Sequence, residues 1–311
     1  MQARRTGPLL PPGGKFGDFS PIRLGGGNRS VRRRRASIGR MRYGVTITGG
    51  PVSDQIELAR TAEAAGWDGV FTWDGIHVGD QMEVHDPWVL MGAFAMATER
   101  VRIGAMIQPL SRRRPWKVAR ESVTLDHVSN GRFVLCVGLG AMDDSGWGRV
   151  GEETDRRIRA ERLDETLQIL TGLWTGEPYG FTGEHYAFAQ MAFRPTPKQQ
   201  PRIPIWVVGA WPSERSMRRA ARHDGLLPNV VGGGELTPEL IKEMCVWISQ
   251  RRSLDGFEIV IEGKSPRNDP GSASAEARRW ADAGATWWIQ SDWETFDPEV
   301  ARGRIEAGPP R

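Results

Sequence analysis

The chain has 311 residues, of which 39% are hydrophobic, and a formal net charge of +4. This length and apolar content suit one large domain, and no segment approaches the roughly 20 consecutive apolar residues of a membrane-spanning helix. The two cysteines, Cys136 and Cys245, lie far apart in apolar surroundings. That pattern is typical of buried thiols in a reducing compartment such as the cytoplasm, and not of a redox or metal site.

The positive charge is concentrated in residues 1–40, which hold ten basic side chains and one acid, Asp18. This segment is rich in glycine and proline, and we expect a disordered basic extension ahead of a mildly acidic domain over 41–311. Three interpretations of the extension remain: upstream sequence before a start at Met41, a tail that contacts nucleic acid or acidic surfaces, or a targeting segment. A secretory signal is disfavoured because Leu9-Leu10 is too short an apolar stretch. We expect the folded domain to bind neither nucleic acid nor membrane.

From residue 43 onward, short apolar runs alternate with helical periodicity. Eight strands are predicted, at residues 43–47, 69–73, 101–106, 132–137, 205–208, 225–228, 257–261 and 286–290. Seven helices are predicted between them, beginning at Ser53 as N-cap and then covering 87–97, 115–128, 154–174, a short stretch from 213, 237–252 and 274–283. Residues 177–203 form an excursion before the fifth strand, with a hairpin expected around Thr182-Gly183-Glu184.

Eight strand-helix units with uninterrupted apolar strands predict a parallel (β/α)8 TIM barrel with an insertion before strand five. A doubly wound sheet is the main alternative, and its mark would be a glycine fingerprint after the first strand. Here that turn reads Thr48-Gly-Gly-Pro51, with a proline where backbone donors are needed, and Gly138-Leu-Gly140 lacks the third glycine. The barrel is therefore favoured.

The working residues of such a barrel lie at the C-terminal ends of its strands. Asp74 and His77 follow the second strand, and either could exchange a proton with a substrate, although a structural cap is an equally ordinary role. Gly138 and Gly140 allow a backbone approach to a phosphate or merely a tight turn. Arg112 to Arg114 either hold an anionic cofactor tail or form a surface charge run. The histidines show no metal-ligand spacing, so no metal site is predicted.

Several stretches, in this order, resemble the luciferase-like flavin-dependent oxidoreductases of the bacterial luciferase superfamily. The resemblance runs from Met41 to the C-terminus, and its blocks are Gly66-Trp-Asp-Gly-Val-Phe-Thr-Trp-Asp74, Ala97-Thr-Glu-Arg-Val-Arg-Ile-Gly104, Arg113-Arg-Pro-Trp-Lys117, Gly131-Arg-Phe-Val-Leu-Cys-Val-Gly-Leu-Gly140, Asp164-Glu-Thr-Leu167, Pro204-Ile-Trp-Val-Val-Gly209 and Gly284-Ala-Thr-Trp-Trp288.

The resemblance implies a barrel that binds reduced FMN or the deazaflavin coenzyme F-420, and it suggests a homodimer. It places the cofactor ring near Trp73, Asp74, Met106 and Ile107, with a cis peptide near Met106. The cofactor phosphate would lie near the residues after strands four and five, which are Gly138, Leu139, Gly140, Gly209, Ala210 and Trp211. Two departures stand out: Gly75 replaces a histidine common in relatives, and the strand-four loop continues as Ala141-Met-Asp-Asp-Ser145.

Three functions follow as hypotheses. The first is an oxidoreductase that transfers hydride between reduced deazaflavin and a small organic substrate, with Asp74 and His77 handling protons or orienting the ring. The second is an FMN-dependent monooxygenase that inserts one oxygen atom from O2. The third is a non-catalytic flavin-binding protein, which the Gly75 departure favours. The sequence does not identify the substrate.

Overall fold

The structure is a computed structural model that describes residues 41–265, 269–294 and 297–310. The extension predicted at residues 1–40 lies outside these ranges. Within them, none of the helices is long and apolar enough to cross a membrane.

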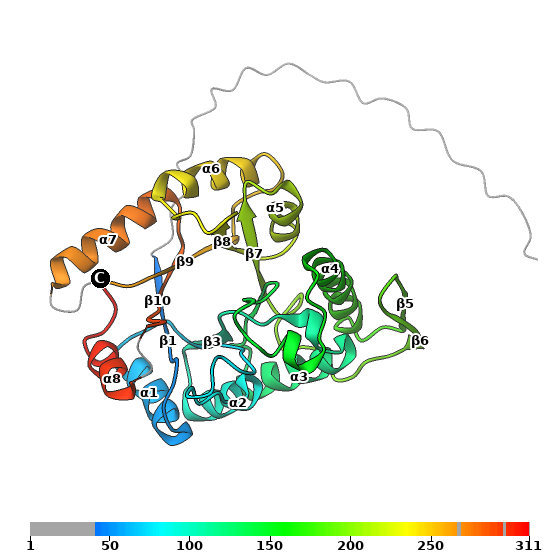
Figure 1. Cartoon of the computed structure of the whole chain (residues 1–311), viewed down its shortest axis with the longest axis horizontal. Coiled ribbons are helices and arrows are strands. Elements are labelled where there is room, and N and C mark those ends of the chain that lie inside the picture. The colour runs from blue at the N-terminus through cyan, green and yellow to red at the C-terminus, as the bar shows by residue number, and fades with distance from the viewer. Residues whose placement is uncertain (1–40, 266–268, 295–296, 311) are drawn as a thin grey trace, which may run out of the picture. The chain divides into compact units, whose positions relative to one another are not determined.

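Eight parallel strands form the centre of the molecule, in the order β3-β2-β1-β10-β9-β8-β7-β4 (Figure 1). Two parallel bridges, Ile103 to Phe133 and Gln108 to Val137, join β3 to β4 at the remaining seam. The predicted TIM barrel is therefore confirmed. The strands are β1 (Arg42–Thr46), β2 (Gly69–Thr72), β3 (Arg102–Ala105), β4 (Leu135–Val137), β7 (Ile205–Trp211), β8 (Gly225–Val230), β9 (Glu258–Gly263) and β10 (Trp287–Gln290).

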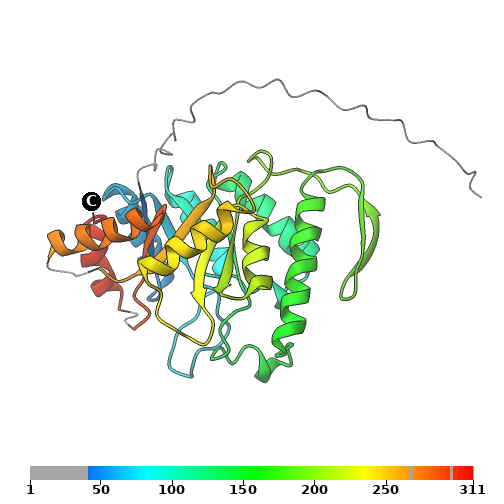
Figure 2. The same ribbon diagram turned by 90° about the horizontal axis from the view of Figure 1, so that it is seen from above.

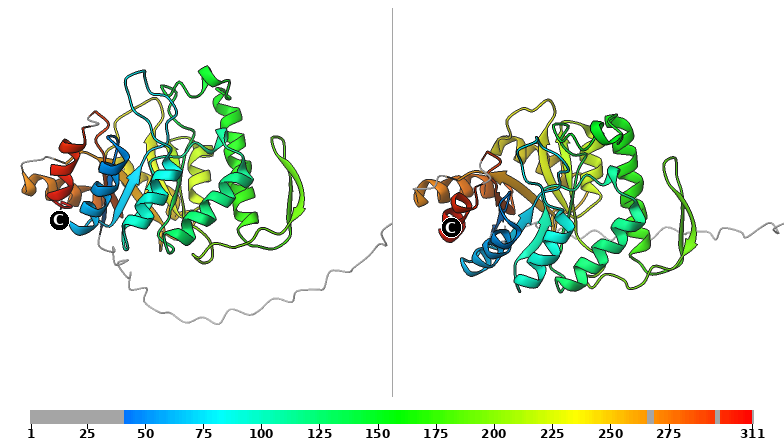
Figure 3. Two further views of the ribbon diagram at one scale, coloured as in Figure 1. Left: turned by 90° about the horizontal axis from the view of Figure 1, so that it is seen from below. Right: turned by 60° about the horizontal axis from the view of Figure 1, so that its bottom comes forward.

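Helices cover the outside of the barrel and return the chain from each strand to the next (Figure 3). They are α1 (Val52–Ala64), α2 (Pro87–Ala97), α3 (Pro115–Val128), α4 (Arg156–Leu173), α5 (Glu214–Ala221), α6 (Pro238–Ser249), α7 (Pro270–Ala283) and α8 (Pro298–Glu306). A short 3-10 helix, η1 (Leu110–Arg112), follows β3. Proline at the first turn of α2, α3 and α6 fits each start, because that position needs no intrahelical N–H bond.

The predicted excursion contains an antiparallel hairpin of β5 (Tyr179–Thr182) and β6 (Ala187–Met191), as expected from its turn residues. The hairpin stands outside the barrel beside α4 (Figure 2). Glu165 of α4 holds the turn against the helix, because its carboxylate accepts hydrogen bonds from the backbone N–H groups of Glu184, His185 and Tyr186.

One predicted helix cap was wrong, and one helix was not predicted. The N-cap of α1 is Pro51 and not Ser53, and no side chain caps this helix. The sequence reasoning also missed α8, which completes the eighth strand-helix unit and packs against α1. Its N-cap Asp297 accepts the N–H of Glu299. The indole of Trp67 donates to the carbonyl of Ile305 at 2.9 Å, which fixes α8 to the barrel.

Aromatic rings fill the interior of the barrel. Phe71, Trp206 and Trp287 come from three strands, and their ring centroids lie 5.3–6.2 Å apart. All three side chains are buried, together with Val260 and Cys136. The barrel is therefore a packed core without a channel, and ligands must bind above it, where the strands end.

Candidate active site

A cavity of about 350 Å³ opens at the C-terminal ends of the strands. This volume lies at the lower end of the range of small-molecule sites. The walls come from the segments after β2, β3, β4 and β10, and they are mostly apolar. Met106 and Ile107, at the end of β3, line the cavity, and the peptide bond between them is cis, as the resemblance implied.

Three tryptophans line this cavity, and each indole N–H is bound to a protein acceptor. Trp73 donates to the carbonyl of Thr48 at 2.7 Å, Trp147 to the carbonyl of Ala141 at 3.0 Å, and Trp293 to Oε2 of Glu262 at 3.1 Å. Because these donors are already used, the rings offer the cavity carbon edges and faces. Such walls fit a planar aromatic group.

The walls also approach each other closely at the backbone. Gly140 has φ +81°, and a Cβ placed on it would lie 2.7 Å from Trp147 and 2.8 Å from Pro109, which both line the cavity. Only glycine fits this conformation and this space without strain. The width of the cavity therefore depends on glycine at position 140, because any Cβ there would push Trp147 and Pro109 apart.

A buried ion network stands behind one wall. Arg112 donates from Nη2 to Oδ1 of Asp74 at 2.9 Å and from Nη1 to Oδ2 of Asp144 at 2.6 Å. Arg113 donates to the other oxygen of Asp74 at 3.1 Å. Burial raises the pKa of the Asp74 carboxyl, and the charges of Arg113 and Arg112 oppose that shift. Both oxygens of Asp74 are occupied, so this carboxylate anchors the arginine loop.

Asp144 has the opposite pKa shift. Burial alone would raise the pKa of this carboxyl, but hydrogen bonds from Arg112 and from the backbone N–H groups of His77 and Gly146 lower it below its usual value. Asp144 therefore joins the β2, β3 and β4 segments around the cavity as a fixed anion.

The structure brings five predicted site residues to this cavity: Trp73, Asp74, Met106, Ile107 and Gly140. His77 does not line it. Its imidazole lies 3.1 Å from the carboxylate of exposed Asp80, at the outer end of the loop. The backbone of His77, in contrast, belongs to the Asp144 network.

Gly209 and Trp211, which were predicted to lie near the cofactor phosphate, do not line this cavity. Both make packing contacts instead. A Cβ on Gly209 would lie 2.3 Å from Leu226 and 2.9 Å from Met217, so this glycine allows β7 to pack against α5. The ring of Trp211 packs edge-on against Trp247 of α6, with centroids 6.5 Å apart.

The three remaining predicted residues do not line the cavity either. A Cβ on Gly138 would approach the side chains of Val208 and Ile107 within 2.9 Å, which places Gly138 next to the cavity floor. The carbonyl of Leu139 accepts a hydrogen bond from Arg159 at 2.6 Å, and the N–H of Ala210 donates to Ser216 at 3.0 Å.

Sequence reasoning missed Glu262, at the end of β9. Strand alternation puts it on the same inward face as Val260, so it stands at the mouth of the barrel. Its side chain is reachable by water, yet the surrounding protein desolvates it and raises its pKa to about 7, with the Trp293 hydrogen bond acting against that shift. Because side chains alternate along a strand, counting two residues on from Val260 would have predicted that Glu262 faces the mouth of the barrel.

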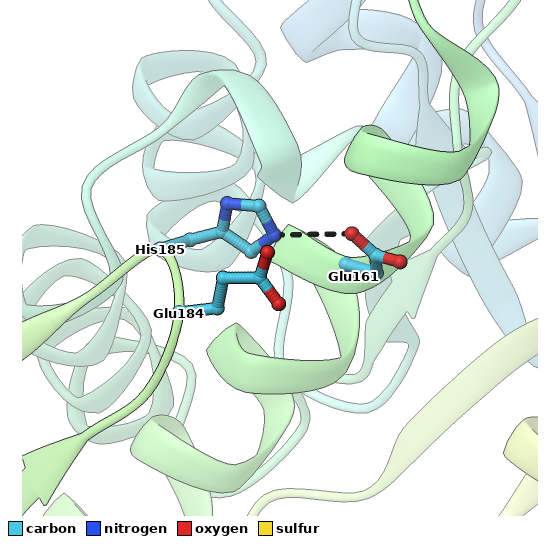
Figure 4. Close-up of side chains that lie close together, drawn as sticks. All are labelled: Glu161, Glu184 and His185. Atoms are coloured by element: carbon cyan, nitrogen blue, oxygen red, sulfur yellow. Dashed lines mark hydrogen bonds and ion pairs between the residues drawn. The ribbon is translucent and has the colours of Figure 1, made fainter.

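Another cluster lies away from the mouth. Glu161 of α4 and Glu184 and His185 of the hairpin bring their side-chain ligand atoms within 4.8 Å of one another (Figure 4). The Nε2 atom of His185 lies 3.3 Å from Glu161, and the same carboxylate accepts from Arg157 at 2.8 Å. Glu161 is therefore already paired with the guanidinium of Arg157, and we interpret the group as the polar contact that holds the hairpin on α4.

A family model described as luciferase-like monooxygenase matches residues 30–309. The chain is 31% identical over 236 residues to a protein from Gordonia bronchialis named F420-dependent glucose-6-phosphate dehydrogenase, a match that covers 73% of this chain and 68% of the relative.

Two solved structures are similar in fold at low identity. One is the coenzyme F420-dependent tetrahydromethanopterin reductase from Methanopyrus kandleri, with a TM-score of 0.69 and 15% identity over 87% of this chain and 98% of that one. The other is the monooxygenase RslO1 from Streptomyces bottropensis, with a TM-score of 0.69 and 18% identity over 86% and 96%.

Proposed function

From the premise that this chain belongs to the luciferase-like monooxygenase family and is an oxidoreductase of that family, we propose that it transfers hydride between a deazaflavin and a small organic substrate. The observation that carries the proposal is the cavity over Met106 and Ile107, with its tryptophan walls. The name of the Gordonia bronchialis relative supports the deazaflavin over FMN.

The cavity fits the ring system of such a cofactor, because its walls contain three tryptophan rings, are mostly apolar and are closed at the bottom by the barrel core. When bound, the deazaflavin would supply a carbon that accepts or gives up hydride. Met106 and Ile107 would support the ring from below, and Trp73, Trp147 and Trp293 would exclude water from its edges.

The chain itself must handle a proton when a substrate alcohol or carbonyl changes oxidation state. Asp74 lines the cavity, but both of its carboxylate oxygens accept hydrogen bonds from arginines. Glu262 does not line the cavity itself, but it accepts a hydrogen bond from Trp293, which does, and its pKa of about 7 lets it both hold and release a proton near neutrality. We therefore assign proton exchange to Glu262 and orientation of the loop to Asp74. His77 is not assigned a role in proton exchange, because its side chain contacts Asp80 outside the cavity.

A titration tests the choice of cofactor. The protein is titrated separately with oxidised coenzyme F-420 and FMN while tryptophan fluorescence is recorded. We expect F-420 to quench the signal at micromolar concentration and FMN to bind far more weakly. A Trp293→Phe variant should lose part of the quenching, whereas Trp247→Phe on the outside should lose none. Tight FMN binding without F-420 binding would reverse the assignment.

FMN-dependent monooxygenation is the second candidate. The family description and the fold shared with RslO1 favour it, and the same apolar walls would serve it by keeping water out of the site. Oxygen consumption distinguishes the two. The reduced enzyme of a monooxygenase consumes one O2 per substrate turned over, whereas the proposed hydride transfer proceeds without O2. Glucose 6-phosphate is the first substrate to test, since it appears in the relative's name.

We also propose that the chain forms a homodimer through α2. This helix contains no charged residue, yet it leaves the side chains of Val89 and Met96 74% and 77% exposed. A helix that is apolar all round is typical of one buried on both sides. A cytoplasmic location, suggested by the free thiols Cys136 and Cys245, completes the proposal.

A further inference from the structure

A second cavity, of about 220 Å³, lies outside the barrel mouth. It is enclosed by η1 and the start of α3 on one side and by α4 and the β5–β6 turn on the other. Ser111, Arg114, Arg162 and His185 line it, and Glu152 is the single acid among its lining residues. Arginine therefore predominates in its walls, whereas the walls of the main cavity are mostly apolar.

The arginines of this second cavity differ in their partners. Arg112 and Arg113 also line it, but their charges are already neutralised by Asp74 and Asp144. Arg114 and Arg162 form no ion pair within the described ranges. Burial raises the pKa of Tyr186, and the charges of Arg162 and Arg114 act against that shift, so both guanidinium groups lie near this hydroxyl. Two arginines against one acid, Glu152, leave the cavity with a net positive charge.

Two further polar features face the same space. The side chain of Ser111 is buried, with the residue 4% exposed, and its hydroxyl has no hydrogen-bond partner among the described residues. A buried hydroxyl without a partner costs free energy unless a ligand satisfies it. In addition, α3 begins beside the cavity, at its N-cap residue Arg114, and the dipole of the helix favours an anion there. Its first turn offers few N–H donors, because Pro115 has none and the N–H of Lys117 donates to the carbonyl of Arg114.

We propose that this second cavity is a binding site for a phosphate group, held by Arg114, Arg162 and the Ser111 hydroxyl beside the N-terminus of α3. Arginine suits this role because its planar fork donates two parallel hydrogen bonds to phosphate oxygens. The phosphate belongs either to the charged end of a bound cofactor or to a separate phosphorylated ligand. The first alternative rests on the proposed function, and the second does not.

Calorimetric titration of the whole protein with inorganic phosphate tests the site directly. We expect one phosphate to bind per chain, with an affinity that falls steeply as sodium chloride is added. Arg162→Gln should weaken binding at least tenfold. Arg156→Gln is the matched control, because Arg156 is exposed on the same helix and does not line the cavity. Equal binding by both variants would overturn the proposal, as would weak binding of wild type indistinguishable from an adventitious ion.

Two further variants separate binding from folding. Ser111→Ala should weaken phosphate binding several-fold while leaving the melting temperature unchanged or raised, because it removes an unsatisfied buried hydroxyl. Glu152→Gln should tighten binding several-fold, since it removes the acid from the wall. A fall in melting temperature for Ser111→Ala with unchanged phosphate affinity would show that the hydroxyl is structural and contradict its place in the site.

The source of the phosphate is found by comparing ligands with and without it. FMN is compared with riboflavin, and coenzyme F-420 with its chromophore lacking the phosphate-bearing tail. If the cofactor supplies the phosphate, Arg162→Gln weakens only the tail-bearing members of each pair, and free phosphate competes with them. If a separate ligand supplies it, phosphate still binds to protein saturated with cofactor. Loss of redox activity with intact phosphate binding would count against the proposed function alone.

Discussion

Nη2 of Arg112 lies 2.9 Å from Oδ1 of Asp74, and the two side chains are 2% and 1% exposed. This pair connects the segment after β3 to the segment after β2, and the second amino group of Arg112 extends the connection to Asp144 after β4. Three of the four segments that line the main cavity are therefore held by one guanidinium group. The guanidinium also lies over the ring of Trp147, 5.1 Å from its centroid.

Removing this guanidinium should be costly. We expect Arg112→Ala to lower the free energy of unfolding by roughly 3–5 kcal/mol, because two buried carboxylates lose the arginine that they share. Arg112→Lys should recover little of the loss, since one ammonium cannot serve two carboxylates in the same geometry. Urea denaturation provides the measurement. Arg60→Ala is the control, because its ion pair with Glu57 is exposed and should be worth less than about 1 kcal/mol.

Glu262 should make stability depend on pH. Its pKa is raised from 4.5 to about 7, so the folded state binds its proton more tightly than the unfolded state does. The folded state therefore gains its full stabilisation from protonated Glu262 below pH 4.5, the pKa of this group in the unfolded chain. This stabilisation is lost as the pH rises through about 7. Relative to wild type, Glu262→Gln should therefore become progressively more stable between pH 5 and 8, as measured by melting temperature.

The same variant tests the proton assignment. Glu262→Gln should slow substrate turnover at every pH and abolish any rate change near pH 7, while cofactor binding stays intact. Glu243→Gln, on the exposed face of α6, should alter neither the stability profile nor turnover. An unchanged pH–rate profile in Glu262→Gln would assign proton exchange to another group.

Gly140 should not tolerate a side chain. Gly140→Ala is expected to lower stability by about 1–3 kcal/mol, because alanine is strained at a positive φ, and its Cβ would also press on Trp147 and Pro109. Cofactor affinity should fall with it, since both residues line the cavity. Gly148→Ala is a fair comparison, because a Cβ there has nothing within 4 Å. Similar effects from the two substitutions would argue against a tight wall at Gly140.

The apolar face of α2 makes a prediction about assembly. The Met96→Glu variant places a charge at the most exposed side chain of α2. We expect it to sediment as a folded monomer in a sedimentation velocity experiment, whereas the wild type sediments as a dimer. Val246→Glu introduces a charge at another exposed aliphatic side chain, on α6, and should not change the oligomeric state. A wild-type chain that sediments as a monomer at high concentration would contradict the proposed dimer.

The fold was predictable because strand and helix periods are local. Residues such as Pro87 and Pro115 mark helix starts by their own backbone chemistry, and both helices begin where the sequence indicated. The hairpin and all eight barrel strands were likewise found from nearby residues. The helix α8 escaped notice because the turn before it, at Asp297-Pro298, was not used as a start signal.

The site was less predictable because its contacts join distant segments. Asp74 was identified from its position at a strand end, but nothing near it in sequence indicated that Arg112 and Arg113 would occupy both of its oxygens. Trp147 and Trp293 reach the cavity from loops whose course no periodicity describes. The phosphate-binding roles expected of Gly209 and Trp211 came from the resemblance and stay predictions, while their packing against α5 and α6 is what the structure describes.

The tryptophan-filled barrel also bears on the order of kinetic events. Since Phe71, Trp206 and Trp287 block passage through the centre, two ligands that share the upper cavity must both enter it from the side of the C-terminal strand ends. The ligand seated deeper, against Met106 and Ile107, has to arrive first and depart last. Steady-state turnover should then follow a compulsory sequence, in which the small product escapes before the redox partner is exchanged.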